Sequence, residues 1–215
     1  LIGRKDIISF LNKKIDFGEN WVICGEKGMG KSSIIQTMFY DHYGTMREYY
    51  YTKYKMLVLL YEVTSKTSDK KEFYESLLVE LDNAAEILRT IDQDSYEIYQ
   101  SARIHAGKRS SNYGIIFQNL VKELVLKKFR LLIVIDCFEH LLKIADSELS
   151  KEEFITLRDL VDKNRMVSCL IASEKTITDV AKGVQGSNFE TTLQFKKIPP
   201  FSKLETELFL KDVFI

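Results

Sequence analysis

The stretch WVICGEKGMGKSSIIQTMF, Trp21 to Phe39, decides how the rest of this chain is interpreted. Its first four apolar residues predict a short buried strand, and the apolar positions after Lys31 recur at helical spacing. Between them lie three glycines, followed directly by a lysine and two serines. This arrangement predicts a loop of unusual backbone freedom at the carboxyl end of a strand.

The loop itself, GEKGMGKS from Gly25 to Ser32, matches the phosphate-binding pattern GxxxxGK[ST] in full and in the required context. Glycines let successive backbone N–H groups surround a phosphate chain, and the following helix adds the positive end of its dipole. We expect Lys31 to reach the β- and γ-phosphates and the Ser32 hydroxyl to enter a Mg²⁺ shell. A glycine-rich turn that matches by chance is the less favoured alternative. The loop therefore predicts a site for ATP or ADP with Mg²⁺.

Other candidate residues follow two further apolar runs. LLIVIDCFEHL carries Asp136 to the end of a buried strand, where we expect it to hold Mg²⁺ together with Ser32. Many P-loop ATPases have a glutamate directly after this aspartate to orient the attacking water, but this chain has Cys137. Glu139 could replace it only if its loop turns inward, so we expect slow hydrolysis. Ser173, which ends VSCLIAS, is either an ordinary strand end or a contact to the γ-phosphate.

Short apolar runs alternate with helical patterns along the chain, which is typical of a parallel sheet covered on both faces. We expect the α/β fold of a P-loop NTPase, a three-layer sandwich whose five-stranded parallel sheet has the order 5-1-4-3-2. The expected strands are Trp21–Cys24, Met56–Val63, Leu131–Ile135, Val167–Ala172 and Leu193–Ile198. The expected helices are Lys5–Lys14, Lys31–Tyr40, 69–88, Tyr113–Lys127, 150–164 and 202–214. Asp69, Ser150 and Ser202 are expected to cap three of these helices.

Two basic segments remain open to interpretation. Between Tyr43 and Lys55 lie five tyrosines and three lysines or arginines. They could form a stacking surface for single-stranded nucleic acid, but we favour a mobile, partly exposed connection, since base-binding platforms usually lie on a rigid sheet. The stretch Ala102–Asn112 is expected to be a solvated basic loop.

The composition gives no indication of a strongly charged partner. Lys+Arg and Asp+Glu each total 31 among 215 residues, so a nucleic acid or anionic lipid would need a local patch. No apolar run reaches the roughly 18 residues of a membrane span, and LIGRKDIISFL has neither a signal-peptide core nor a cleavage site. The chain has an odd number of cysteines, Cys24, Cys137 and Cys169, and no CxxC motif. This pattern is typical of free thiols in a reducing compartment. A nucleophilic pair of Cys137 with His140 is conceivable but less favoured than a packed cysteine. We expect a cytoplasmic protein.

Several of these segments resemble one family. LIGRKDIISFL resembles the hhGRxxEhxxL segment of STAND ATPases, multidomain signal-transduction ATPases that include NACHT and NB-ARC relatives, and of AAA+ proteins of origin-licensing type. IDCFEHLL resembles their magnesium strand, with cysteine in place of the first glutamate. Residues 186–210 resemble their closing strand and the helix that leads into a lid. Residues 41–112 resemble nothing familiar, and Ser173–Glu174 stands where the family has serine–arginine, which puts arginine sensing of the γ-phosphate in doubt.

The resemblance implies an architecture and a function. Residues 1–198 would form the nucleotide-binding domain, and residues 199–215 would begin a helical lid. Effector and sensor domains would flank them in the same protein, outside this chain. The function would be a switch, in which ATP favours an open form that associates into homo-oligomers and ADP favours a closed form. Similarity to bacterial members implies a role in antiviral defence or stress response.

The expected site combines the motif with the resemblance, which places the first three of its residues at the base end of the nucleotide. Expected catalytic residues are Lys31, Asp136, Glu139 and Ser173, and expected metal ligands are Ser32 and Asp136. Expected nucleotide-binding residues are Ile2, Gly3, Arg4, Gly25, Glu26, Lys27, Gly28, Met29, Gly30, Lys31, Ser32 and Ser33.

Two alternatives belong to other functional classes. A DNA-associated AAA+ ATPase, of origin-licensing or transposition-loader type, shares the Gly-Arg segment and the strand pattern, but the neutral net charge gives it no support. A P-loop kinase would need an arginine-rich lid inside the core, which only AGKRSS, 106–111, approaches.

Overall fold

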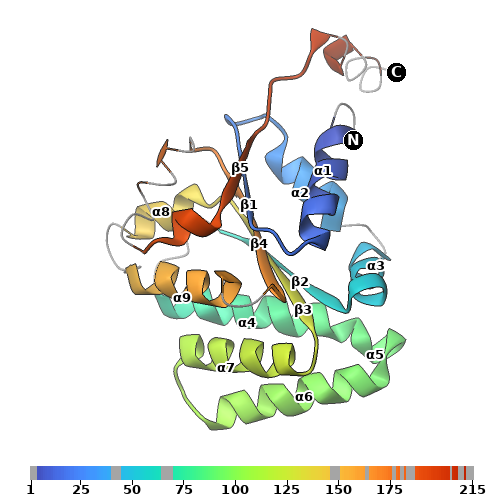
Figure 1. Cartoon of the computed structure of the whole chain (residues 1–215), viewed down its shortest axis with the longest axis vertical. Helices are drawn as coiled ribbons and strands as arrows, with labels where there is room; N and C mark the ends of the chain where they lie inside the picture. Colours follow the sequence, from blue (N-terminus) through green and yellow to red (C-terminus); the bar gives the residue numbers. More distant parts are fainter. Residues whose placement is uncertain are drawn as a thin grey trace.

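The computed structural model contains a single parallel sheet with helices on both faces (Figure 1). It describes residues 4–39, 45–63, 70–145, 151–162, 165–175, 178–179, 182, 187–203, 205–207 and 211. The strands are β1 Trp21–Cys24, β2 Met56–Glu62, β3 Arg130–Asp136, β4 Val167–Ser173 and β5 Gln194–Lys197. Their order is β2-β3-β4-β1-β5, with every neighbouring pair parallel. The expected α/β P-loop fold is confirmed, and so is the order 5-1-4-3-2, read from the other edge.

The helices divide between the two faces of the sheet. They are α1 Lys5–Asp16, α2 Lys31–Phe39, α3 Thr45–Tyr54, α4 Lys70–Glu86, α5 Leu88–Ile91, α6 Gln93–Lys108, α7 Tyr113–Leu126, α8 Glu139–Ala145 and α9 Lys151–Asp162, with a 3-10 turn at Phe189–Thr192. Helices α1, α2 and α3 share a core with one face, while α4 to α9 contribute to the core on the other. Within the described ranges, no helix combines the length and the apolar character needed to cross a bilayer.

Strand side chains alternate between these two cores, as the pleat of a strand requires. In β3, Leu132 and Val134 pack with α1 and α2, whereas Leu131 and Ile133 pack on the opposite face. All four are almost completely buried, which explains why the run LLIVI contains no polar position. The alternation also fixes the face of the sheet to which each residue at a strand end belongs.

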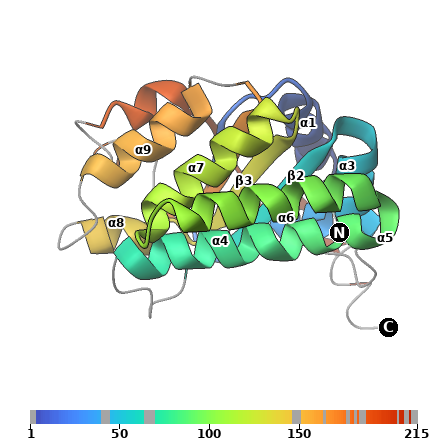
Figure 2. The same cartoon turned by 90° about the horizontal axis from the view of Figure 1, so that it is seen from below.

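Helices α5 and α6 were not expected from the sequence. Helices α6 and α3 both occupy segments for which the sequence suggested another structure. Figure 2 shows α6 beside α4 and α7 in a layer beneath the sheet. Helix α6 runs through Lys108, so most of the expected basic loop Ala102–Asn112 is helical. Helix α3 occupies most of the Tyr-rich segment that was expected to be a mobile, partly exposed connection. The segment is partly exposed, at Tyr49, but it is a helix that buries Tyr50 and Tyr51. The expected basic loop was wrong because small residues pack most of it as a helix.

After β5 the chain leaves the sheet as a non-helical segment through Pro199 and Pro200 (Figure 1). Ser202 then forms the expected capping box, since its Oγ accepts the Glu205 N–H at 3.2 Å and its own N–H donates to Glu205 Oε2 at 2.7 Å. The expected caps at Asp69 and Ser150 lie outside the described residues.

Candidate nucleotide-binding site

The glycine-rich loop connects β1 to α2 at the carboxyl edge of the sheet. Gly28 and Gly30 have φ of +82° and +81°, in the left-handed region where side chains other than hydrogen are strained. Gly25 has no such φ, and a Cβ there would meet Met29 and Ile198 at ordinary contact distances of 3.4–3.5 Å. Two of the three glycines are therefore required by the backbone conformation of the loop.

Lys31 is the only lysine or arginine besides Arg4 that is buried among the described residues, and it lies at the centre of this loop. Its Nζ donates to the carbonyl oxygens of Gly25 and Glu26 at 2.8 and 3.0 Å. An ammonium group has three donors, so one remains for another acceptor. The neighbouring Ser32 side chain is exposed in the first turn of α2 and open to a ligand.

Asp136 ends β3, two strands away from the loop, because β4 lies between β1 and β3. One carboxylate oxygen accepts the Cys137 N–H at 2.9 Å, and the side chain is partly exposed. Leu132 and Val134 of β3 pack on the α2 face of the sheet. Asp136 lies two residues after Val134, so its side chain belongs to the same face. Asp136 and the first turn of α2 thus belong to the same face and edge, as a shared metal ion would require.

Cys137, at the usual position of the catalytic glutamate, has a left-handed φ of +58°. Burial, and then the charges of Asp136, Glu139, Glu62 and Glu174, raise the pKa of its thiol to about 11. The thiol is therefore neutral at physiological pH, and a thiol is a weak hydrogen-bond acceptor.

Glu139 and Ser173 lie at the same edge, and each already accepts one backbone N–H. Glu139 is only 6% exposed, and its Oε2 accepts the Glu174 N–H at 3.0 Å, which ties the loop after β3 to the end of β4. Ser173 is fully buried, and its Oγ accepts the Lys175 N–H at 3.1 Å. In this structure both side chains stabilise the backbone at the strand ends.

Arg4 joins three parts of the chain beside the loop. Its Nη2 donates to the Met29 carbonyl at 3.0 Å and its Nη1 to the Pro199 carbonyl at 2.9 Å, while the guanidinium lies 4.2 Å from the ring centroid of Phe201. Arg4 is 1% exposed, yet its Nε has no hydrogen-bond partner among the described residues. A Cβ on Gly30 would lie 3.9 Å from that Nε. Of the expected base-end residues, Ile2 and Gly3 lie outside the described ranges.

A comparison with known protein families identifies the family of this chain. A family model described as an AAA domain matches residues 18–179, which includes the glycine-rich loop, Asp136 and Ser173. The chain belongs to this AAA domain family. Among curated proteins, no sequence matches it significantly.

Several solved structures share the fold of this AAA domain. The ORC1 protein of Aeropyrum pernix in complex with DNA has a TM-score of 0.61 and 14% identity over 99% of this chain and 49% of its own. The ORC2 protein of the same organism, in ADPNP–ADP complexes, gives 0.62 and 17% over 98% of this chain and 51% of its own. The Walker-type ATPase PABY2304 of Pyrococcus abyssi gives 0.61 and 14% over 100% and 58%. The chain thus spans about half the length of these proteins.

Sequence reasoning overlooked one residue of this AAA domain. Glu62 ends β2 and pairs in register with Asp136, and its side chain is exposed. The signal was present in the run MLVLLYE, where a single carboxylate follows six apolar residues. Without the register of β2 against β3, nothing related that carboxylate to Asp136.

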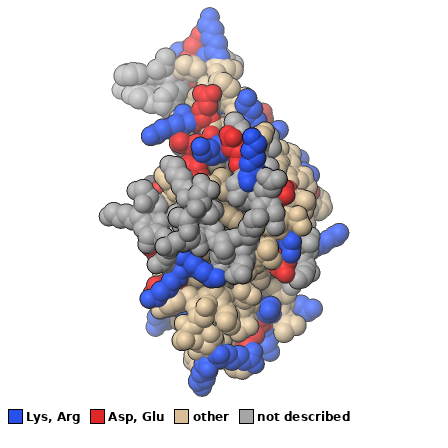
Figure 3. All heavy atoms as spheres, turned by 90° about the vertical axis from the view of Figure 1, so that its left-hand side faces the viewer, with Lys and Arg blue, Asp and Glu red and all other residues tan. Residues whose placement is uncertain are grey.

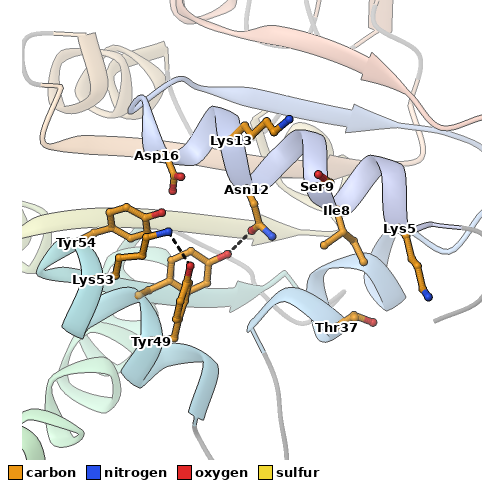
Figure 4. A pocket seen from close by; sticks show the side chains of 11 residues that line it. Lys5, Ile8, Ser9, Asn12, Lys13, Asp16, Thr37, Tyr49, Lys53 and Tyr54 are labelled. Carbon is orange, nitrogen blue, oxygen red and sulfur yellow. Dashed lines mark hydrogen bonds between the residues drawn. The ribbon is translucent and has the colours of Figure 1, made fainter.

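A second surface lies between α1 and α3, outside the loop (Figure 4). It is an open groove of about 500 Å³ with tyrosines on one side and the lysines of α1 on the other. Tyr50 donates from its hydroxyl to Asn12 Oδ1 at 2.5 Å, and Lys53 Nζ donates to the Tyr49 hydroxyl at 2.8 Å (Figure 4). Lys53 also lies 4.8 Å from the ring centroid of Tyr54. The groove thus combines the exposed ring of Tyr49 and the half-buried ring of Tyr54 with several lysines and with Asp16.

Proposed function

We propose that this AAA domain binds ATP with Mg²⁺ and hydrolyses it slowly, as the regulatory switch of a STAND-like signalling ATPase. The observation that carries the proposal is the loop after β1, where Gly28 and Gly30 have a left-handed φ and the buried Lys31 donates from Nζ to two backbone carbonyls of the loop. Such a loop offers inward backbone N–H groups and one compact cation to a chain of phosphates.

The residues present fit the nucleotide and its metal. Ser32 offers an exposed hydroxyl and Asp136 a partly exposed carboxylate on the same face of the sheet. Magnesium is usually held by one or two such oxygens together with phosphate oxygens, and it supplies charge neutralisation at the transferring phosphate. The unpartnered Nε of the buried Arg4, beside Gly30, is a further donor at this loop.

In this mechanism Lys31 exchanges its acceptors. Its Nζ moves from the carbonyls of Gly25 and Glu26 to phosphate oxygens, so that the ammonium is satisfied in both states. Turnover is slow because position 137 offers a neutral thiol and Glu139 is engaged with the Glu174 N–H. A slow rate suits a switch, since the lifetime of the ATP-bound state then sets the lifetime of the signal.

The regulatory part of the proposal concerns the chain after β5. Residues 199–215 begin a lid, whose position follows the nucleotide because Arg4 contacts both the loop and Pro199. The ATP-bound form then associates into homo-oligomers and signals through effector or sensor domains of the same protein, in a cytoplasmic role such as antiviral defence.

Nucleotide binding is tested by replacing Lys31. The Lys31→Ala variant should lose affinity for labelled ATP by about 100-fold or more, because a charge-assisted contact to the phosphates is removed. Lys122→Ala is the matched control, since Lys122 is an exposed lysine of α7, outside the loop, and should change affinity by less than about threefold. Equal ATP retention by both variants would contradict the proposal.

A second candidate, a DNA-associated ATPase, is supported by the groove between α1 and α3. Exposed aromatic rings with nearby lysines are typical of surfaces on which single-stranded bases stack, and here the exposed ring is that of Tyr49 (Figure 4). Against it, Asp16 lines the same groove. On the left-hand side of the molecule, which Figure 3 draws, acidic and basic side chains lie intermixed in the upper half of the face. Fluorescence anisotropy with a single-stranded oligonucleotide separates the candidates. Binding that weakens steeply with salt, and with Tyr49→Ala, would favour the DNA-associated ATPase.

A further inference from the structure

Glu62 and Asp136 lie side by side at the carboxyl edge of the sheet. They are register partners at the ends of β2 and β3, and the Val63 N–H extends the pairing by donating to the Asp136 carbonyl at 3.1 Å. Neighbouring strands are separated by about 4.8 Å, so the two Cα atoms are close.

The two side chains also belong to the same face. Val58 and Leu60 of β2 pack in the core of α1, α2 and α3, together with Val134 of β3. Two residues further along each strand, the same alternation places Glu62 and Asp136 on the α2 face. This is the face from which Ser32 approaches the metal in the proposed site.

Glu62 is available for chemistry, whereas the other candidates at this edge are not. Its side chain is exposed. Because β2 is the edge strand, Glu62 also borders an open groove whose other lining residues include those of α4, a helix that packs on the opposite face. Glu139 is buried and accepts the Glu174 N–H, and Ser173 is buried and accepts the Lys175 N–H. Cys137 offers only sulfur, a weak acceptor.

Besides Glu26 of the loop after β1, Glu174 is another exposed carboxylate at this edge among the residues that the structure describes. It follows the end of β4, where the last strand residue, Ser173, pairs with Cys24 of β1. Asp136 has no partner on β4, since that pairing ends at Ile135 with Ile171. Glu62 is thus the carboxylate in register with the proposed metal ligand.

We propose that Glu62 is the catalytic residue that orients and deprotonates the attacking water in this chain, in place of the glutamate missing at position 137. The inference rests on the proposed ATPase function. The water oxygen forms a bond to the γ-phosphorus while the bond from that phosphorus to the β–γ bridging oxygen breaks. ADP leaves with the bond's electron pair, and the water proton passes to the Glu62 carboxylate and then to solvent.

The test uses Glu62→Gln in the full-length protein, since glutamine keeps the shape but cannot accept a proton. Turnover should fall about 100-fold, because a positioned general base contributes at least that much. Affinity for ATP–Mg²⁺ should change by less than about threefold, since Glu62 is outside the phosphate loop. Trapping of ADP with aluminium fluoride, which mimics the transition state, should be lost alongside turnover and gives a readout independent of rate.

Two further variants make the test specific. Glu75→Gln is the matched control, because Glu75 is an exposed glutamate in the same groove, on α4. It should leave both turnover and trapping unchanged. Adding Cys137→Glu to Glu62→Gln should restore turnover, since it returns a carboxylate to the position after Asp136.

The outcomes separate this inference from the proposed function. If the unaltered protein fails to bind ATP, the proposed function is wrong and this inference falls with it. If it binds ATP but shows no turnover, the proposed hydrolysis and the role of Glu62 are both wrong, and only ATP binding stands. If the unaltered protein turns over ATP and Glu62→Gln does so equally well, only the role of Glu62 is overturned. A loss in Glu174→Gln without a loss in Glu62→Gln would also overturn it.

Discussion

At the scale of single residues, Gly28 is the position that best tests whether the loop needs a left-handed backbone conformation. A Cβ at this position would meet nothing within 4 Å, so any cost of a side chain comes from its φ of +82° alone. Gly28→Ala should therefore lower the free energy of unfolding by about 1–2 kcal/mol, the cost of a left-handed conformation. If the loop relaxes to relieve this strain, its N–H groups turn away and ATP affinity falls. Urea unfolding and ATP titration measure the two effects.

Gly107 provides the matched control for this substitution. It lies in helix α6, and its Cβ would also meet nothing within 4 Å. Gly107→Ala should raise the free energy of unfolding by about 0.5–1 kcal/mol, because alanine loses less entropy in a helix. A similar loss of stability in both variants would show that φ is not what matters at Gly28.

The sequence predicted the identity of the site residues better than their contacts. Lys31 and Asp136 follow from the motif and the strand pattern, because both are local signals. The left-handed φ of Cys137, the burial of Glu139 and the register of Glu62 depend on β3 and its neighbours. These are tertiary facts, and no local pattern contains them.

At the scale of elements, strands were more predictable than helices. All five strands were expected within one or two residues. For β1 to β4 the reason is that buried parallel strands have nearly continuous apolar runs, whereas β5, QFKK, has no buried residue. Helix α6 was missed because its buried residues are Ser95, Tyr99, Ala102 and Ala106, at helical spacing but mostly small or polar. Helix α3 was missed because its tyrosines suggest exposure, although Tyr50 and Tyr51 are buried in different cores.

The start of α6 depends on Asp92. One carboxylate oxygen accepts the Ser95 N–H at 3.1 Å, and the other accepts the Tyr51 hydroxyl proton at 2.5 Å. Asp92→Ala should cost about 1 kcal/mol of unfolding free energy at pH 7, as for other N-cap residues. Asp94→Ala, in the same first turn, is the control and should cost less. Equal losses in urea unfolding would argue against a capping role.

The carboxylate of Asp92 also makes the free energy of unfolding depend on pH. The Tyr51 hydrogen bond, and then the Ser95 N–H, hold the pKa of Asp92 below its usual range. Its contribution to stability is therefore fully present above the unfolded pKa of about 3.9 and disappears as the pH falls through the lower folded value. The difference between the unaltered chain and Asp92→Ala should shrink when urea unfolding is repeated near pH 3. A difference that grows toward acid pH would contradict this assignment.

At the scale of the whole molecule, Arg4 connects the phosphate loop to the segment that follows the sheet. Arg4→Ala removes donors from the Met29 and Pro199 carbonyls, so the free energy of unfolding should fall by about 2–4 kcal/mol and ATP affinity should fall with it. Arg4→Lys should be intermediate, because lysine cannot form the planar fork. Lys5→Ala, an exposed neighbour, is the control. Loss of stability without loss of affinity would limit Arg4 to a structural role.

The central claim is that the loop after β1 holds the phosphates of ATP and that Ser32 and Asp136 hold its metal. A crystal structure with a non-hydrolysable ATP analogue and Mg²⁺ tests it most directly. We expect Lys31 Nζ to have left the carbonyls of Gly25 and Glu26 for phosphate oxygens, and Mg²⁺ to lie about 2.0–2.1 Å from Ser32 Oγ with Asp136 beside it. An analogue bound elsewhere, with Lys31 still on those two carbonyls, would contradict the claim.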